Sequence, residues 1–243
     1  MATKCDSSRD VISELPTDVK ERILARLPTR QAARTAILST GWRDVWLGLG
    51  QIVVDSDLLQ CVRRCEGDRS VAFVNMINDI LLCHPGPVKK FTLCPYLSGF
   101  KLKQSDFDRC AKQFTIALQL LKNSTNLCEL EVKASYWTFL SDGIRLPEDC
   151  GCIIDQDLKM LHTLKIESFT GSTVEMFFVK MLLFKSPVLE KVVIQGSNDL
   201  NPSMALKISK ELLRFPRASP KAEVVYMDYH LGYGVRDWLH CMV

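Results

Sequence analysis

The sequence predicts a mixed helical and β-sheet fold, in which a module of three short helices precedes a series of strand–helix repeats. Two observations lead to this prediction. Three helical patterns, separated by turn residues, occupy the segment from Leu15 to Leu49. Beyond them, a spaced apolar pattern with the alternation of a strand occurs four times between Val88 and Ile194.

The first predicted helix begins close to Pro16, because proline suits the first turn of a helix. Asp18 and Glu21 place negative charge near the positive end of the helix dipole. Pro28 ends this helix, and Thr29 is expected to cap the next one. The apolar residues of the first helix recur at helical spacing and are Val19, Ile23, Leu24 and Leu27.

The second and third predicted helices carry apolar side chains of very different size. The second is expected to pack closely against its neighbours through Ala32, Ala33, Ala36 and Ile37. Ser39 is expected to cap the third helix. The apolar face of the third helix holds Trp42, Val45, Trp46 and Leu49. Three helices of this size bury little surface, so part of their apolar surface should meet a partner or the rest of the chain.

This segment also contains a series of short motifs, which are Leu15-Pro16, Ile23-Leu24, Leu27-Pro28-Thr29, Ala33, Thr35, Leu38-Ser39, Trp42-Arg43 and Val45-Trp46. Together they resemble the F-box of plant proteins that combine an F-box with leucine-rich repeats. The resemblance implies a module that binds a small Skp-type adaptor, which in turn binds a cullin scaffold with its RING subunit. It also implies the residues that bind this adaptor or support the interface: Leu15, Pro16, Ile23, Leu24, Leu27, Pro28, Leu38, Ser39 and Trp42.

One position departs from the family pattern. Gly41 stands where the family usually has Lys or Arg immediately before the tryptophan. The change removes a charge and costs about 1 kcal/mol of helix propensity relative to Ala. We therefore expect weaker binding of the adaptor, with the apolar contacts retained.

Arginine recurs at every fourth position of this segment, at Arg22, Arg26, Arg30 and Arg34. Such a strip would complement an acidic adaptor and speed its association, whereas the alternative for any single arginine is a solvated helix face. A DNA-binding helix-turn-helix is disfavoured, because the first sixty residues hold eight basic and eight acidic side chains. Phosphate binding normally needs an excess of positive charge.

An L-x-x-L-x-[VIL] pattern marks four predicted strands. Its copies are Val88-Phe91-Leu93, Leu127-Leu130-Val132, Leu161-Leu164-Ile166 and Leu189-Val192-Ile194. Helical periodicity predicts helices at 69–83, 105–122, 172–185 and 203–214. Stacked strand–helix units predict a short curved solenoid with a parallel sheet. Consecutive copies start 39, 34 and 28 residues apart, so these leucine-rich repeats are degenerate, and the loop at 137–155 is expected to bulge outward.

The last third contains a second series of motifs, which are Phe169-Thr170-Gly171, Glu175, Phe178-Val179-Lys180, Pro187-Val188-Leu189-Glu190-Lys191, Leu212-Leu213-Arg214-Phe215, Arg217-Ala218-Ser219-Pro220 and Ala222-Glu223-Val224. They resemble the FBD domain that follows the repeats in the same plant family. The resemblance implies no chemistry for this domain. We expect it to complete and cap the solenoid, with Arg217 and Glu223 bringing charge to its exposed end.

The two resemblances divide the chain into an F-box at 8–50, a degenerate leucine-rich-repeat-like region at 51–150, an FBD domain at 151–228 and a divergent tail at 229–243. The tail is expected to hold at most a short helix around Trp238. Members of the family normally carry more repeats between the F-box and the FBD domain. The region around 107–114 passes almost directly from the first repeat to the last ones, which indicates an internally shortened form.

Composition and charge disfavour several classes of partner and location. Lys and Arg total 31 against 28 Asp and Glu, so the net charge of +3 indicates neither a nucleic-acid nor a membrane partner. The first ten residues lack the apolar core of a secretory signal, and no apolar run reaches the roughly 18 residues of a membrane span. These features predict an intracellular protein of the nucleus or the cytoplasm, with its ten cysteines reduced.

The sequence contains no recognisable catalytic, cofactor-binding or metal-binding motif. It has no phosphate-binding loop, Rossmann fingerprint or nucleophile elbow. Two cysteine pairs raise the question of zinc, but neither has the C-x₂-C spacing of structural zinc sites; they are Cys61 with Cys65, and Cys150 with Cys152 near His162. The histidines lack a nucleophile to pair with and are interpreted as surface or loop residues: His84, His162, His230 and His240.

These inferences combine into one leading hypothesis: a non-catalytic substrate-recognition adaptor of a Skp-cullin-F-box ubiquitin ligase. The F-box would bind the Skp-type adaptor, and the repeats would hold an unknown target protein near the ubiquitin-carrying enzyme, so that catalysis arises from proximity. The alternative is a shortened decoy, which occupies the adaptor without delivering a target. An enzyme acting on a small molecule is a third reading, which would require a large polar pocket with converging titratable groups.

Overall fold

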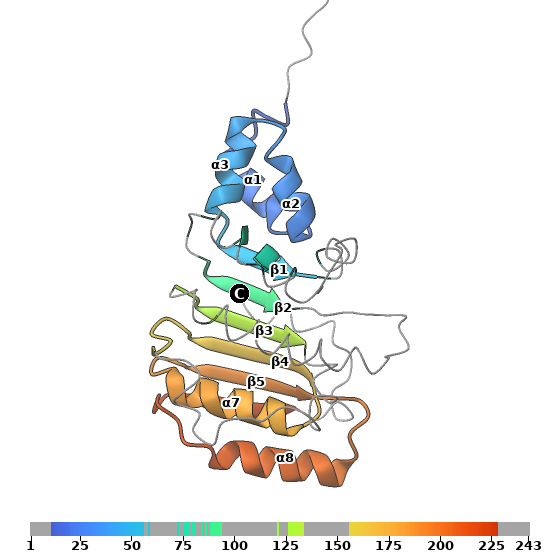
Figure 1. Cartoon of the computed structure of the whole chain (residues 1–243), viewed down its shortest axis with the longest axis vertical. Helices are drawn as coiled ribbons and strands as arrows, with labels where there is room; N and C mark the ends of the chain where they lie inside the picture. Colours follow the sequence, from blue (N-terminus) through green and yellow to red (C-terminus); the bar gives the residue numbers. More distant parts are fainter. Residues whose placement is uncertain are drawn as a thin grey trace, which may run out of the picture.

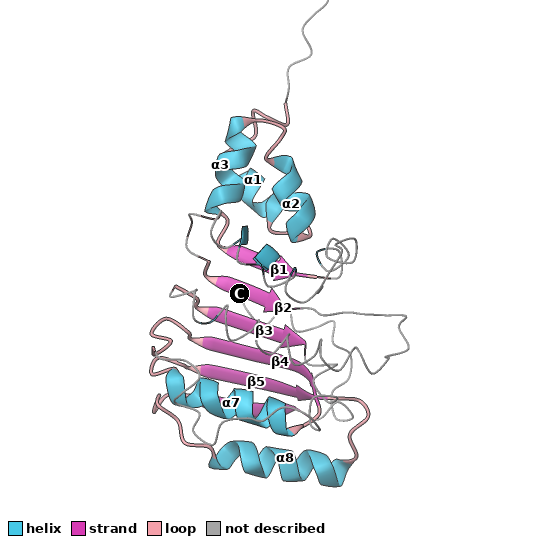
Figure 2. Cartoon of the chain, in the orientation of Figure 1, coloured by secondary structure: helices cyan, strands magenta, loops and turns pink. Residues whose placement is uncertain are grey.

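The chain folds into three helices followed by a parallel β-sheet, with two further helices near the C-terminal strands (Figures 1 and 2). This computed structural model describes residues 11–55, 58, 72, 75–77, 79–80, 84, 86, 88–93, 121, 126–133 and 156–227. Within that part of the chain, no helix is both long and apolar enough to cross a membrane.

All three predicted N-terminal helices are present, as α1 (Thr17–Leu24), α2 (Thr29–Thr35) and α3 (Thr40–Gly48). The predicted cap of the third helix is confirmed, because the Ser39 side chain accepts a hydrogen bond from the Trp42 N–H. The predicted cap at Thr29 is wrong. Pro28 holds the cap position of α2, and the Thr29 hydroxyl instead accepts a hydrogen bond from the Val53 N–H at 2.8 Å.

Six parallel strands stack in chain order, so each strand pairs with the one that precedes it in the sequence (Figure 1). The four predicted strands are confirmed as β2 (Lys90–Leu93), β3 (Glu129–Lys133), β4 (Thr163–Phe169) and β5 (Lys191–Gly196). The prediction missed the two outer strands, β1 (Gln51–Val54) and β6 (Glu223–Met227).

The missed strand β1 carries the same pattern as the predicted repeats. Leu49, Ile52 and Val54 have the L-x-x-L-x-[VIL] spacing, and Ile52 pairs in register with Phe91 of β2. Leu49 also packs in the core of the three helices, together with Trp42. Leu49 therefore belongs both to the helical pattern of the third helix and to the strand pattern. Because its spacing fits the helix, the beginning of the first strand was not recognised from the sequence.

The predicted repeats share one buried face of the sheet. Each of strands β2 to β5 places apolar side chains in the core at two equivalent positions, and all of these side chains are at most 8% exposed. The strand pairs align these positions in two rows across the sheet, because side chains alternate between the faces of a strand. The first row is Phe91, Leu130, Leu164 and Val192, and the second is Leu93, Val132, Ile166 and Ile194.

A backbone ladder repeats with the strands although the intervening segments differ in length. The Gly50 carbonyl accepts hydrogen bonds from two consecutive N–H groups at the start of β2, at 2.8 and 2.9 Å. The same arrangement recurs at each of the next three strand starts, where the accepting carbonyls belong to Lys89, Cys128 and His162. The variable segments therefore rejoin the sheet at an equivalent position in every repeat.

Two of the predicted helices are confirmed as α7 (Thr173–Lys185) and α8 (Pro202–Arg214). Helix α7 is buried along most of its length, whereas α8 buries a narrower stripe formed by Ala205, Ile208 and Leu212. The other two predicted helices, at 69–83 and 105–122, lie mostly outside the described residues, although those described within 72–80 are helical, as is Leu121. The predicted loop at 137–155 and the whole tail at 229–243, including Trp238, also lie outside the described residues.

The turn from β4 into α7 is tightly constrained. Ser168 (φ 57°) lies at an irregularity in the pairing of β4 with β5, which lets Phe169 keep its place in the core. Gly171 has φ 76°, and a Cβ atom there would lie 2.4 Å from Cδ1 of Ile208 in α8. The motif Phe169-Thr170-Gly171 thus has a structural explanation, since only glycine combines this backbone conformation with such close packing.

Candidate functional site

The turn between α2 and α3 presents adjacent apolar side chains to solvent. Ile37 is 83% exposed and Leu38 is 59% exposed, and Ile23 on α1 is 37% exposed. The expectation that Ile37 packs against neighbouring helices is wrong, because α2 ends before this residue. Single exposed apolar residues are ordinary, but an adjacent pair at a turn indicates a contact surface. We call Ile37 and Leu38 the apolar turn.

The nine residues implied by the F-box resemblance differ widely in exposure. Leu24 and Trp42 are only 1% and 2% exposed and belong to the core of the module, so they support its shape and cannot contact a partner directly. The remaining predicted residues are exposed or half-buried: Leu15, Pro16, Ile23, Leu27, Pro28, Leu38 and Ser39. The exposed apolar residues Val11, Ile12 and Ile37 were not among the residues predicted from the sequence. For Ile37, its position in the turn just before the Ser39 cap could have indicated exposure.

The space beside Gly41 is bordered by a lysine of α1. Lys20 is 7% exposed, and its Nζ donates a hydrogen bond to the Ser13 carbonyl at 2.8 Å. The same Nζ lies 5.6 Å from the centre of the Trp42 ring, within the range of a cation–π interaction. A Cβ atom at Gly41 would lie 3.2 Å from this Nζ. A cation therefore contacts Trp42 from α1, and glycine at position 41 leaves room for it.

The four regularly spaced arginines do not form one strip. Arg22 lies on α1 and Arg26 follows the end of that helix, whereas Arg30 and Arg34 lie on α2. The helix break at Pro28 interrupts the four-residue spacing. Arg30 and Arg34 share a concave surface, a depression of about 400 Å³ lined by Leu27, Arg30, Gln31, Arg34 and Thr35.

The end of the helical module that lies opposite the apolar turn is joined to the sheet by several contacts. We call these contacts the seam. The Thr29 hydroxyl bonds to β1, and the Gly86 N–H donates to the Leu47 carbonyl at 3.2 Å. The rings of Trp46 and His84 stack at a centroid distance of 5.4 Å. An apolar depression of about 430 Å³ lies beside this stack and is lined by Ala33, Trp46, Leu47, Ala72, Asn75, Met76, Asp79, Ile80 and His84.

His84 is a buried residue of the seam. It lies outside any helix or strand, as a loop residue does, but it is not at the surface. It is 6% exposed, and its Nε2 lies 2.6 Å from the Leu49 carbonyl oxygen. Because a carbonyl can only accept a hydrogen bond, Nε2 is the protonated ring nitrogen. Burial lowers the pKa of His84 below the ordinary value for histidine. The neutral imidazole is therefore the form that the seam stabilises.

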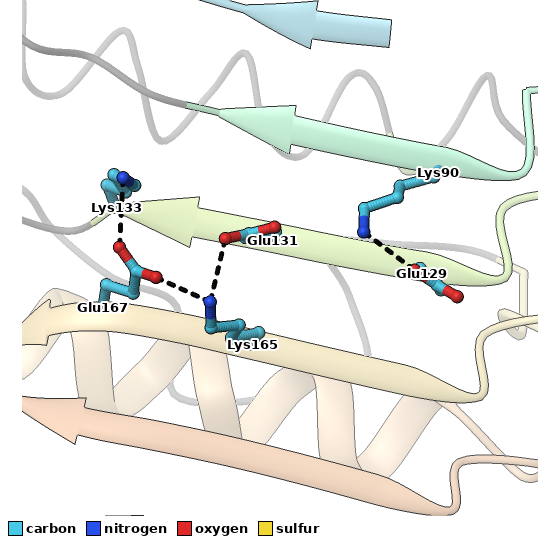
Figure 3. Close-up of polar contacts among 6 residues, drawn as sticks. All are labelled: Lys90, Glu129, Glu131, Lys133, Lys165 and Glu167. Atoms are coloured by element: carbon cyan, nitrogen blue, oxygen red, sulfur yellow. Dashed lines mark hydrogen bonds and ion pairs between the residues drawn. The ribbon is translucent and has the colours of Figure 1, made fainter. Parts of the chain in front are cut away.

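The sheet face opposite the buried rows carries a network of ion pairs (Figure 3). Lys165 lies between two carboxylates, with Nζ at 2.7 Å from Glu167 and 3.1 Å from Glu131. Glu167 also pairs with Lys133 at 3.2 Å. We call this surface the charged face and define it by Lys90, Glu129, Glu131, Lys133, Lys165 and Glu167.

The network shifts the ionisation of its two central groups. Burial alone would raise the pKa of Glu167, but the hydrogen bond and charge of Lys165, together with Lys133, outweigh burial and lower it. Burial would likewise lower the pKa of Lys165, but Glu167 and Glu131 outweigh it and raise that pKa. Both groups are thus held in their charged forms across the neutral range.

Of the residues considered for zinc, the structure describes only His162. The four cysteines of the two pairs lie outside the described residues. His162 is half-buried, and its Nδ1 lies 2.6 Å from the Met160 carbonyl oxygen. Among the residues that the structure describes, no group of three or more His, Cys, Asp or Glu side chains could hold a metal ion.

Comparison with known proteins matches the N-terminal module to a family: residues 12–50 match the F-box domain. An F-box/FBD/LRR-repeat protein of Arabidopsis thaliana is 40% identical over 105 residues, which make up 42% of this chain and 24% of the relative. An F-box/LRR-repeat protein of the same plant is 37% identical over 87 residues, 35% of this chain and 23% of the relative. A second F-box/FBD/LRR-repeat protein is 33% identical over 103 residues, 42% of this chain and 20% of the relative.

The matches thus span between a fifth and a quarter of the length of these relatives. The matched range covers all three helices and the residues of the apolar turn. Residues 12–50 are therefore an F-box domain, and the chain is similar over part of its length to the F-box/FBD/LRR-repeat proteins of Arabidopsis thaliana.

Proposed function

We propose that this chain is a non-catalytic substrate receptor of a Skp-cullin-F-box ubiquitin ligase. Its F-box binds a Skp-type adaptor, which connects the chain to the cullin and RING subunits, and its sheet region binds a target protein. The chain contributes proximity, because it holds the target near the ubiquitin-carrying enzyme. This role places the protein in the nucleus or the cytoplasm.

The observation that carries the proposal is the position of the apolar turn. Helix α2 begins at Thr29, which bonds to β1, and helix α3 leads directly into β1. The turn that joins the other ends of these two helices therefore lies at the end of the module remote from the sheet (Figure 1). Ile37 and Leu38 are free to enter a partner while the seam holds the module on the sheet.

The repeated ladder and the buried rows support the assignment of the sheet region to degenerate leucine-rich repeats. The constrained turn around Gly171 supports an FBD domain in the last third, because the residues that resemble this domain meet there. The boundaries at 8–50, 51–150, 151–228 and 229–243 remain predictions. In this proposal the target binds on the charged face.

The test is binding of the full chain to a purified plant Skp-type adaptor. Replacing Ile37 and Leu38 with Asp should abolish co-purification, since it places two carboxylates in the apolar contact. The matched control is Leu206→Asp with Leu213→Asp, two exposed leucines of α8 at 55% and 59% exposure, which should bind like the wild type. Equal binding by both double variants would show that the apolar turn is not part of the interface. Leu24 and Trp42 are unsuitable probes, because they are buried and their substitution would unfold the module.

A second candidate function is a decoy that occupies the adaptor without presenting a target. It is favoured by the charged face, on which the described lysines and glutamates are paired with one another rather than available to a partner. Reconstituted ligase reactions separate the two functions. A receptor raises ubiquitination of proteins that co-purify with it, whereas a decoy lowers ubiquitination by other F-box proteins and adds no product of its own.

A further inference from the structure

Two arginines of α2 border a depression in the surface of the F-box. Arg30 and Arg34 are four residues apart, so they lie on the same side of the helix. They line the depression of about 400 Å³ together with Leu27, Gln31 and Thr35. The concave surface therefore combines an apolar side chain, two polar side chains and two guanidinium groups.

The charge of this depression is not balanced by the part of the chain that the structure describes. Both arginines are exposed, and no described carboxylate lies within ion-pair distance of either. Helix α2 itself contains no acidic residue. Two like charges at this spacing destabilise a helix, so a bound anion would relieve a repulsion present in the free chain.

Two residues that line the depression are joined by backbone hydrogen bonds to the apolar turn. The Arg34 and Thr35 carbonyls accept hydrogen bonds from the Ile37 and Leu38 N–H groups, at 3.3 and 2.9 Å. The basic depression and the exposed apolar pair thus belong to adjoining turns of one segment. An apolar centre beside a charged rim is the usual anatomy of a protein–protein interface.

We infer that Arg30 and Arg34 bind carboxylate side chains at the rim of the adaptor surface that accepts the apolar turn. This inference rests on the proposed function and adds the chemistry of the partner, which must present acidic residues beside an apolar pocket. Guanidinium groups suit this role because they bind carboxylates with two parallel hydrogen bonds. A nucleic acid fits the surface less well, since the first sixty residues carry equal numbers of acidic and basic side chains.

The test measures association of the full chain with a purified Skp-type adaptor. The variant Arg30→Glu with Arg34→Glu is compared with Lys207→Glu and Lys210→Glu, which change the net charge by the same amount. The two control lysines are exposed on α8, at the end of the molecule opposite the F-box (Figure 1). Because all four side chains are exposed, both variants should fold, and circular dichroism checks this. If the charge-reversed variant Arg30→Glu with Arg34→Glu misfolds, the neutral variant Arg30→Gln with Arg34→Gln takes its place in the comparison.

We expect the arginine reversal to lower the association rate constant by about tenfold or more at low salt, and the lysine reversal by less than about twofold. The difference should shrink between about 0.1 M and about 1 M salt, as the screening length falls from about 10 Å to about 3 Å. Equal rates for the two reversals would overturn the inference while leaving adaptor binding intact. Failure of the wild type to bind would instead overturn the proposed function. Loss of binding to a duplex DNA probe, with adaptor binding unchanged, would assign the arginines to nucleic acid.

Discussion

At the scale of single residues, the turn into α7 shows how a buried carboxyl group is accommodated. Glu175 is fully buried, and its Oε2 accepts hydrogen bonds from the Thr170 N–H, the Thr170 hydroxyl and the Ser172 N–H. Burial raises the pKa of Glu175, against the opposing effect of these hydrogen bonds. Ser172 and Glu175 form a reciprocal capping box at the start of α7. The carboxyl group of Glu175 therefore organises the turn that Gly171 permits.

Gly171→Ala is predicted to destabilise the chain by about 1–3 kcal/mol, because the new methyl group meets Ile208 and the backbone must hold φ 76°. The matched control is Gly48→Ala, at the end of α3, where a Cβ atom would have nothing within 4 Å. That change should be neutral or stabilise by up to about 1 kcal/mol. Urea unfolding measures both. Adding Ile208→Ala should recover part of the loss, and a purely additive double variant would argue against the steric cause.

At the scale of elements, strands β3 and β4 are linked by both their faces. The buried rows pack Leu130 against Leu164 in register, and on the charged face Lys165 joins Glu131 of one strand to Glu167 of its own (Figure 3). Cross-strand pairs of opposite charge stabilise a sheet by a few tenths of a kcal/mol to about 1 kcal/mol. The apolar alternation of these strands is a local signal that the sequence reveals, whereas the pairing of the charges depends on the register between segments far apart in the chain.

Glu167→Gln is predicted to lower the free energy of unfolding by about 0.5–1 kcal/mol at pH 7, since Glu167 contacts two partly exposed lysines. The pKa of Glu167 is lowered in the folded chain, so its contribution is present above the unfolded value near about 4.3 and is lost as the pH falls through the folded value. Glu129→Gln is the control, since Glu129 pairs with one lysine, Lys90, among the described residues and its side chain is 50% exposed. A pH-independent difference between Glu167→Gln and the wild type would contradict the charged network.

At the scale of the whole molecule, the F-box and the sheet share their junction. Leu49 belongs to the helical core and to the first repeat, and Gly50 begins the backbone ladder. Trp46 of α3 stacks on His84, which lies shortly before β2. The helical module and the sheet are therefore connected through packed side chains as well as through the chain itself.

Lowering the pH is predicted to weaken the seam through His84. Its pKa is lowered in the folded chain, so stability is retained above the unfolded value near about 6.5 and falls as the pH drops from there toward the folded value. His84→Phe keeps an aromatic ring against Trp46 but cannot titrate, so it should show a smaller loss of stability between pH 7.5 and 5.5. Near-ultraviolet circular dichroism and urea unfolding measure this, with His162→Asn as the control. If the stability of His84→Phe depends on pH in the same way as that of the wild type, the prediction is wrong.

The sequence by itself determined the helices of the F-box, the four central strands with their shared apolar register, and helices α7 and α8. Each of these depends on periodicity and capping within a short segment, which one sequence displays directly. The tertiary structure alone decided which F-box side chains face solvent, that Thr29 bonds to Val53, and that His84 is buried against Trp46. These features arise from packing between segments distant in the chain, and local spacing carries no record of such contacts.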